Sequence, residues 1–268
     1  MAITTLDGVI AGCQTPKFFY KALSGALVGG RTYTPFYAAG IPGAAVAPTP
    51  GLAGEALTTY AGQIPFSNPG SGTSYLARFV GLSSGQSGQI MLVDRLWHNS
   101  GITITSTASQ TVNSVAYPAR DENGTTNGEG VLLGVEVSTA TGTNAPTITV
   151  TYTNSDNTGS RTGTNIVATS ATSPIGTFYP IGLQAGDKGV RSVQSITLSA
   201  SWTSGTIHLV AYRVLSVIQI GAGGTSTAVD AVTGGMPQMF NNTVPFLLFV
   251  PSGNASTSLQ GSMTVTQG

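Results

Sequence analysis

Short segments rich in β-branched residues recur along most of this chain, and turns of Gly, Asn and Asp separate them. The clearest segment, TITVTYT at residues 147–153, alternates Ile148, Val150 and Tyr152 with threonines, which is the period of a half-buried strand. Residues 89–97 and 130–137 are more continuously apolar, as strands in the middle of a sheet are. This pattern predicts an all-β fold, an antiparallel β-sandwich of jelly-roll-like type.

Further strands are expected at residues 206–215 and 245–250, and SMTVTQ supplies a last strand near the C-terminus. Between residues 190 and 202 the even-numbered positions are mostly apolar and the odd-numbered positions mostly polar. A TSG turn follows directly. We therefore predict that residues 190–215 form one hairpin.

The first 70 residues have a different character from the rest. Leu6, Val9, Ile10 and Cys13 recur at helical spacing and predict a short helix. Residues 33–54 are dense in proline and glycine, which excludes a long helix or a central strand there. We expect residues 1–70 to form an extended, Pro/Gly-rich N-terminal arm and residues 71–268 to form the β-sandwich domain. The apolar side chains of the arm need a surface, either on their own domain or on a neighbouring subunit.

Charged residues are scarce. The 268 residues include ten basic and ten acidic side chains, so the formal net charge is zero. A neutral chain lacks the basic surface that binds nucleic acid or an acidic membrane, and we expect neither partner. Proteins near zero net charge tend to self-associate, which favours a chain that is packed into a larger assembly.

Targeting and cross-linking signals are equally sparse. The N-terminal segment lacks the basic region and long apolar run of a signal peptide, so we expect synthesis in a cytoplasm. The longest apolar stretch near the other end, residues 246–250, is too short to span a bilayer. Cys13 is the only cysteine, which excludes an intramolecular disulfide and a Cys/His zinc cluster.

Three of the few charges lie close together in the segment AGDKGVR. Gly186 and Gly189 allow positive backbone φ angles, and the side chain of Asp187 is able to bond its own backbone. Arg191 follows at the start of a predicted strand. We interpret Gly186, Asp187, Gly189 and Arg191 as a structural turn that fixes strand register.

Five segments together resemble a known group of proteins. They are RTYTPFYAAGIPG (31–43), IMLVDRLWHNSGI (90–102), the pair LLGVEV (132–137) and TITVTYTNSDNTGSRTG (147–163), and FYPIGLQAGDKGVRSVQSITLS (178–199). In this order they are similar to virion structural proteins of tailed bacteriophages, of the head-decoration or auxiliary-capsid (cement) kind. The resemblance covers most of the chain but includes no catalytic or ligand-binding motif.

The resemblance implies a non-enzymatic protein of the virion, made in the host bacterial cytoplasm, that decorates and stabilises the capsid lattice. Its partners would be the major capsid protein and copies of itself in a homo-oligomer such as a trimer. Our candidate contact residues are the aromatic side chains of the arm, Phe18, Phe19, Tyr33, Phe36 and Tyr37. Packing of these side chains on their own domain is the alternative.

No catalytic or cofactor-binding residues are predicted. His98 and His208 lie at a strand end and inside an apolar strand, where we expect them to be hydrogen-bonded structural residues. Serines are so plentiful that a match to a catalytic serine pattern, such as GLSSG at 81–85, is expected by chance and does not indicate a hydrolase. Glu129 and Glu136 are among the few acidic residues that a glycosidase would need as a pair, in a chain that is short for such an enzyme.

Two loops resemble ligand sites only superficially. The loop at 119–130 offers oxygen ligands for Ca²⁺, but its spacing departs from an EF-hand, so we expect a solvated turn and no metal. GAGGTS at 221–226 lacks the third Gly of a dinucleotide fingerprint and the Lys of a P-loop.

Two other classes stay open besides an enzyme. A receptor- or glycan-binding module of a head fibre or tail would need exposed aromatic side chains clustered with amides. A major capsid or tail-tube subunit would need more helix than this Gly-, Pro- and Thr-rich chain offers.

Overall fold

The computed structural model describes residues 3, 5–23 and 25–268. Within them it contains one short helix and 17 strands, and every strand pair is antiparallel. The elements are α1 (Leu6–Ala11), β1 (Lys17–Leu23), β2 (Thr32–Tyr33), β3 (Gly40–Ile41), β4 (Glu55–Ala56), β5 (Ser74–Ser83), β6 (Gly88–His98), β7 (Gln110–Thr111), β8 (Val131–Thr139), β9 (Ile148–Asn154), β10 (Arg161–Asn165), β11 (Thr177–Gly182), β12 (Val190–Leu198), β13 (Thr206–Ile220), β14 (Ser226–Asp230), β15 (Gln238–Met239), β16 (Pro245–Pro251) and β17 (Thr257–Gln267).

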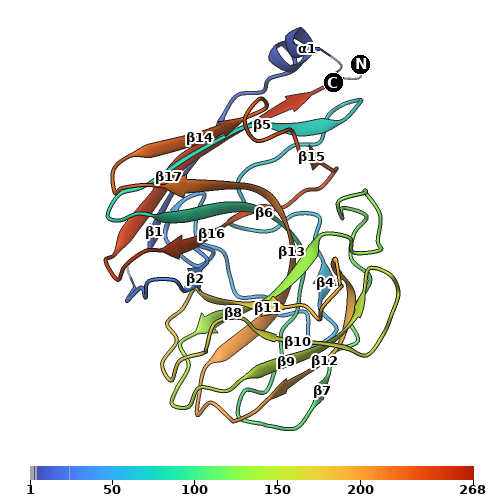
Figure 1. Cartoon of the computed structure of the whole chain (residues 1–268), viewed down its shortest axis with the longest axis vertical. Coiled ribbons are helices and arrows are strands. Elements are labelled where there is room, and N and C mark those ends of the chain that lie inside the picture. Colours follow the sequence, from blue (N-terminus) through green and yellow to red (C-terminus); the bar gives the residue numbers. More distant parts are fainter. Residues whose placement is uncertain (1–2, 4, 24) are drawn as a thin grey trace.

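The strands form two sheets (Figure 1). The six-stranded sheet has the order β14-β5-β17-β1-β3, with β15 also on β5. The eleven-stranded sheet has the order β2-β16-β6-β13-β8-β11-β10-β9-β12-β7, with β4 also on β6. Because β2 pairs with both β16 and β11, the strands β2, β16, β6, β13, β8 and β11 close into a ring.

Three groups of buried apolar side chains form the core. One lies between the six-stranded sheet and β6, β13 and β16, and includes Phe19, Phe79, Ile90 and Phe249. A second packs the outer strands of the larger sheet around Trp97 and Trp202. The third includes Phe36, Phe178, Tyr212 and Phe246 and contains residues of β6, β11, β13 and β16 from the closed ring.

The long strands β6 and β13 contribute to all three groups, because both run through the middle of the molecule (Figure 1). They pair along ten residue positions, from Val210 opposite His98 to Ile220 opposite Gly88. Two register shifts interrupt this pairing, after Ala211 and after Val214. Such shifts bend a strand, and a bent strand is able to contribute side chains to more than one part of the core.

The predicted all-β antiparallel fold is confirmed, and the sheets pack in a sandwich-like and barrel-like arrangement. The predicted strands at 89–97, 130–137, 147–153 and 245–250 correspond to β6, β8, β9 and β16, and the short helix is α1. The predicted hairpin at 190–215 is wrong. β12 pairs with β9 and β7, whereas β13 pairs with β6 and β8, so the two strands that follow each other in sequence do not pair.

The first 70 residues take part in both sheets. β1 lies between β17 and β3, and β2 closes the ring of strands. The ammonium group of Lys21 donates to the carbonyl oxygens of Ala38 and Gly43, at 3.1 and 2.9 Å, and so ties the proline-rich segment to β1. Burial lowers the pKa of Lys21 to about 8. The described part of the predicted arm therefore packs on its own subunit and shares one core with residues 71–268.

Candidate functional site

Strand β1 places aromatic side chains on both faces of the six-stranded sheet. Successive side chains of a strand point to opposite faces. Phe19 points inward and is fully buried, whereas Phe18 and Tyr20 point outward and keep 51% and 38% of their surface exposed. The FFY sequence of β1 therefore supplies one core residue and two surface residues.

Neighbouring strands extend this exposed apolar surface. Ile41 of β3 pairs with Tyr20 and is 57% exposed. On the other side, β17 places Ser262 opposite Phe18 and Gln260 opposite Tyr20, and β5 places Val80 and Leu82 opposite these two residues of β17. We call this surface the outer face; its residues are Phe18, Tyr20, Ile41, Val80, Leu82, Gln260 and Ser262.

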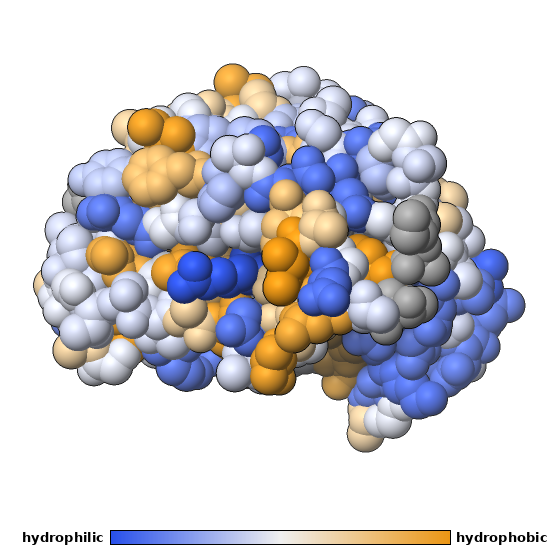
Figure 2. All heavy atoms as spheres, turned by 90° about the horizontal axis from the view of Figure 1, so that it is seen from above, coloured by the Kyte–Doolittle hydropathy of each residue, from blue (hydrophilic) through white to orange (hydrophobic). Residues whose placement is uncertain are grey.

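Helix α1 is a second exposed apolar element. It buries none of its residues, and Leu6 and Ile10, which share one side of the helix, are 64% and 65% exposed. The hydroxyl of Thr266 donates to the carbonyl oxygen of Val9 and attaches α1 to β17. Seen from the end that carries α1, apolar residues gather near the middle of a mostly hydrophilic surface (Figure 2).

The five predicted contact residues have different environments. Phe18 is exposed on the outer face, whereas Phe19, Tyr33 and Phe36 are buried in their own subunit, which is the alternative packing considered for these residues. Each is buried because it faces a neighbouring strand or ring: Phe36, for example, packs 4.9 Å from the ring of Phe246. Tyr37 is half-buried, and its hydroxyl donates to Glu136 at 3.1 Å.

The ion pair between Arg95 and Glu136 lies among residues of the closed ring. The two terminal guanidinium nitrogens, Nη1 and Nη2, donate to the two carboxylate oxygens at 3.1 and 2.8 Å, and both residues are almost fully buried. The guanidinium carbon lies 4.2 Å from the ring centre of Phe36. Burial raises the pKa of Tyr37, and the Glu136 carboxylate raises it further, so the phenol stays a hydrogen-bond donor. Arg95, Glu136, Tyr37 and Phe36 therefore fix one another's positions through these contacts.

A second buried ion pair joins Asp94 and Arg120. The guanidinium donates to both carboxylate oxygens, at 3.0 and 3.1 Å, and to the carbonyl oxygen of Leu57 at 2.7 Å. The backbone N–H of Val244 also donates to Asp94. This pair thereby ties the loop around Arg120 to β6 and to the chain before β16.

Both histidines are hydrogen-bonded structural residues, as predicted. His98 accepts from Arg95 at Nδ1 and donates from Nε2 to Glu55 at 2.9 Å. Burial and the nearby Arg95 charge lower the pKa of His98 to about 2, so the imidazole is neutral. His208 bridges the carbonyl oxygen of Asn99 and the hydroxyl of Ser138.

The predicted turn at 186–191 is an anchor for distant strands. Asp187 accepts hydrogen bonds from Tyr152, Asn154 and Arg161, so the expected bond to its own backbone is replaced by contacts to β9 and β10. The hydrogen bond from Arg161 is the main cause that lowers the pKa of Asp187 to about 2. Gly186 has the expected positive φ of 88°.

Gly189 of this turn serves a different purpose from the predicted one. It is needed for a close backbone approach, because a Cβ atom there would lie 2.0 Å from the carbonyl oxygen of Gly128. Arg191 lies partly exposed on β12.

The loop at 119–130 is organised around Asp121. Its carboxylate accepts hydrogen bonds from the backbone N–H groups of Asn123, Thr125, Gly128 and Glu129, and from the Thr125 hydroxyl. Burial alone would raise the pKa of Asp121, but these hydrogen bonds hold it below its usual value. The carboxylate that a Ca²⁺ ion would need is already used by the loop itself.

The described part of the chain contains neither a metal-ligand cluster nor a membrane-spanning helix. No cluster of three or more His, Cys, Asp or Glu side chains among residues 3, 5–23 and 25–268 is placed to hold a metal ion. In the same ranges no helix has the length and apolarity needed to cross a membrane.

Comparisons with known proteins leave the chain without an assigned family. No family model and no curated protein sequence matches it. Two solved structures of infectious bursal disease virus, one of the Gt strain and one of the VP2 subviral particle, align with 95% and 96% of this chain and with 80% of theirs. Their sequence identities are 9% and 10%, and their TM-scores of 0.20 and 0.19 are too low to support an argument about fold or function.

Sequence reasoning missed most of these contacts. The ion pair of Arg95 and Glu136 joins residues 41 positions apart, and no local pattern announces it. The outer face was detectable in part, because the alternation in β1 separates Phe18 and Tyr20 from Phe19.

Proposed function

We propose that this chain is a non-enzymatic structural protein of a tailed-phage particle. It decorates and stabilises the capsid lattice by binding the major capsid protein through the outer face. Copies of the chain associate with one another, in a homo-oligomer such as a trimer that suits the symmetry of a shell.

The observation that carries this proposal is the outer face. It combines the exposed apolar residues Phe18, Tyr20 and Ile41 with the uncharged Gln260 and Ser262. Contiguous exposed apolar surface on a soluble protein marks an interaction site. Burying such surface contributes about 25 cal/mol per Å² removed from water, and repetition across a lattice multiplies the effect.

Helix α1 supports self-association. A helix of six residues is too short to be stable in isolation, and this one buries no side chain on its own subunit. A neighbouring copy that covers Leu6 and Ile10 would supply the missing packing. We therefore assign α1 to the contact between copies and the outer face to the contact with the capsid.

The use of the titratable groups favours a structural role. Both histidines, Asp94, Asp121 and Glu136 are engaged in hydrogen bonds or ion pairs that hold strands and loops together. The sequence resemblance to head-decoration proteins points in the same direction.

The capsid contact is tested by adding purified protein to particles that lack it and measuring co-sedimentation. The double variant Phe18→Ser/Tyr20→Ser should bind at least about tenfold more weakly than the wild type, because hot-spot aromatic residues dominate such contacts. Ile166→Ser is the matched control, since Ile166 is 68% exposed and directly follows β10 of the eleven-stranded sheet, away from the outer face. Equal binding of the double variant and the wild type would exclude the outer face as the contact.

Two further measurements test the wider proposal. Quantitative mass spectrometry of purified particles should find a copy number that is a simple fraction of the major capsid protein, and absence of the chain would refute a structural role. Light scattering should show an oligomer for the wild type and a smaller species for Leu6→Ser/Ile10→Ser. An unchanged oligomer would exclude α1 as the contact between copies.

A further inference from the structure

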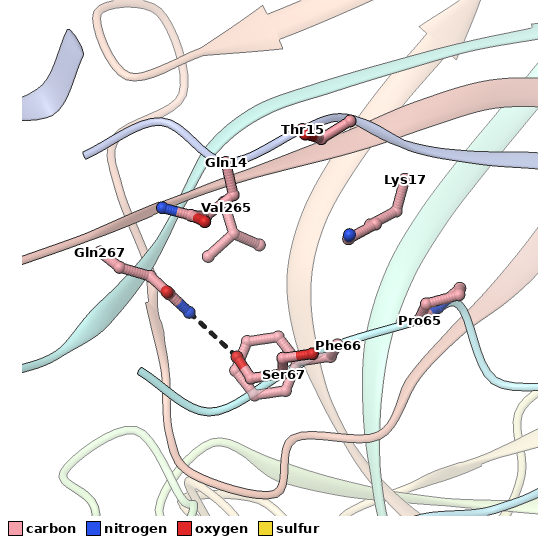
Figure 3. Close-up of a pocket in the computed structure, with 8 residues that line it drawn as sticks. All are labelled: Gln14, Thr15, Lys17, Pro65, Phe66, Ser67, Val265 and Gln267. Atoms are coloured by element: carbon pink, nitrogen blue, oxygen red, sulfur yellow. Dashed lines mark hydrogen bonds between the residues drawn. The ribbon is translucent and has the colours of Figure 1, made fainter. Parts of the chain in front are cut away.

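A small cavity opens where β1 begins and β17 ends. Its volume is about 110 Å³. The segment that precedes β5 forms its opposite wall (Figure 3). The lining residues are Gln14, Thr15, Lys17, Pro65, Phe66, Ser67, Val265 and Gln267. This cavity is separate from the outer face, because Lys17 and Val265 belong to the inner side of the six-stranded sheet.

Two glutamine amides on the wall are fixed by the protein itself. The amide nitrogen of Gln14 donates to the carbonyl oxygen of Gly12 at 2.9 Å. The amide nitrogen of Gln267 donates to the carbonyl oxygen of Ser67 at 2.9 Å and to the hydroxyl of Ser74 at 3.1 Å. Neither amide oxygen receives a hydrogen bond from the described residues, so both are free to accept one from a ligand hydroxyl.

The ammonium group of Lys17 points into the cavity from the side that faces Gln14 (Figure 3). Within the described ranges Lys17 forms no ion pair. The lower wall is the ring of Phe66, which packs against the core, and the buried Val265 completes an apolar surface. A cation, two glutamine amides and an aromatic ring thus line one small cavity.

We propose that this cavity binds a carboxylated sugar, such as the uronic acid of a surface polysaccharide. Lys17 would donate to the carboxylate, the oxygens of Gln14 and Gln267 would accept from ring hydroxyls, and the C–H face of the sugar would pack on Phe66. The cavity is smaller than the roughly 300–1,000 Å³ of sites for drug-sized ligands, so it holds one sugar unit of a longer chain.

The donor and acceptor pattern distinguishes this ligand from simpler anions. A peptide carboxylate would satisfy Lys17 but offers no hydroxyl donor to the two amide oxygens, and a phosphate dianion offers one hydroxyl for two amide oxygens. A neutral sugar would satisfy the amides and leave the ammonium group unpaired. Only a ligand that carries both hydroxyls and a negative charge uses all the polar groups of the wall. This binding activity is independent of the proposed structural function, because it uses neither the outer face nor α1.

The test combines two NMR measurements on the full-length protein, with D-glucuronate, D-glucose and acetate as probes. Ligand-observed saturation transfer detects binding, and ¹H–¹⁵N spectra of the labelled protein record the side-chain amide signals. Glucuronate should bind most tightly and should shift the side-chain amide signals of Gln14 and Gln267. Lys17→Met and Lys17→Gln should each weaken glucuronate binding at least about tenfold, because a charge-assisted hydrogen bond is lost. Lys188→Met removes the same charge from an exposed turn on the other sheet and should leave binding unchanged.

Thermal unfolding of every variant checks that the fold is retained. If one of the two Lys17 variants does not fold, the other still tests the contribution of the charge. Several results would overturn the proposal: no saturation transfer from glucuronate, equal binding by the Lys17 variants and the wild type, or acetate or glucose binding as tightly as glucuronate. Acetate alone matching glucuronate would assign the cavity to an acidic peptide or another bare carboxylate.

Discussion

Replacing Glu136 with Gln should lower the free energy of unfolding by about 3–5 kcal/mol, because it leaves the buried Arg95 guanidinium without its counter-charge. Arg95 donates two hydrogen bonds to the carboxylate, and hydrogen bonds to charged groups are worth about 1.5–3 kcal/mol each. Gln retains one acceptor oxygen, but it is neutral. The remaining contacts of Arg95, with His98 and the ring of Phe36, supply no negative charge.

Urea unfolding followed by tryptophan fluorescence measures this effect, since Trp97 and Trp202 are both fully buried. The double variant Arg95→Met/Glu136→Leu is the matched control. It removes both charges and should lose less stability than Glu136→Gln, because no uncompensated charge stays inside. A loss below about 1 kcal/mol for Glu136→Gln, or a larger loss for the double variant, would refute the reasoning. If Glu136→Gln does not fold while the double variant does, the prediction holds.

Three further predictions concern the turn and the surface. The folded-state pKa of Asp187 is about 2, below its unfolded value of about 3.9, so its contribution to stability is present above about pH 4 and disappears as the pH falls toward 2. The free energy of unfolding of Asp187→Asn, measured as the pH is lowered, should lack this part of the wild-type pH dependence. If the variant and the wild type lose stability with the same pH profile, the prediction is wrong. Gly186→Ala should cost about 1–2 kcal/mol through its positive φ, and Gly189→Ala should cost more, because its Cβ meets the backbone of Gly128. Urea unfolding ranks the two variants, and the opposite order would show that the turn relaxes. Wild-type binding to particles, through Phe18 and its neighbours, should change little between about 0.1 and 1 M salt in co-sedimentation, whereas a steep fall would indicate charged contacts.

Local patterns were sufficient to predict individual strands. The alternation of Ile148, Val150 and Tyr152 corresponds to inward-facing positions of β9, because side-chain period and burial are both local properties. The pairing of β10 with β9 has an equally local cause, since a tight turn joins the two strands. The α1 helix likewise follows from the spacing of Leu6 and its neighbours.

Pairing between distant strands was not predictable in this way. Sequence adjacency suggested that β12 pairs with β13, but in the structure β12 pairs along its length with β9. A half-buried strand presents the same alternation to any partner, so the pattern does not specify which strand lies beside it. The partners of Asp187 were missed for a related reason. Arg161 and Tyr152 reach Asp187 only because β9 and β10 pass beside the turn.

A large share of the few charged residues of this chain lies in its interior. Seven of the 20 charged residues are buried, namely Lys21, Asp94, Arg95, Arg120, Asp121, Glu136 and Arg213. A buried charge is costly unless it is paired and hydrogen-bonded, so these residues specify which strands and loops meet. The surface is left with few charges, and the contacts proposed above would therefore depend on apolar area and uncharged hydrogen bonds. An outer face built from Phe18, Tyr20 and Ile41 between serine and glutamine side chains is the kind of surface that this division of charge produces.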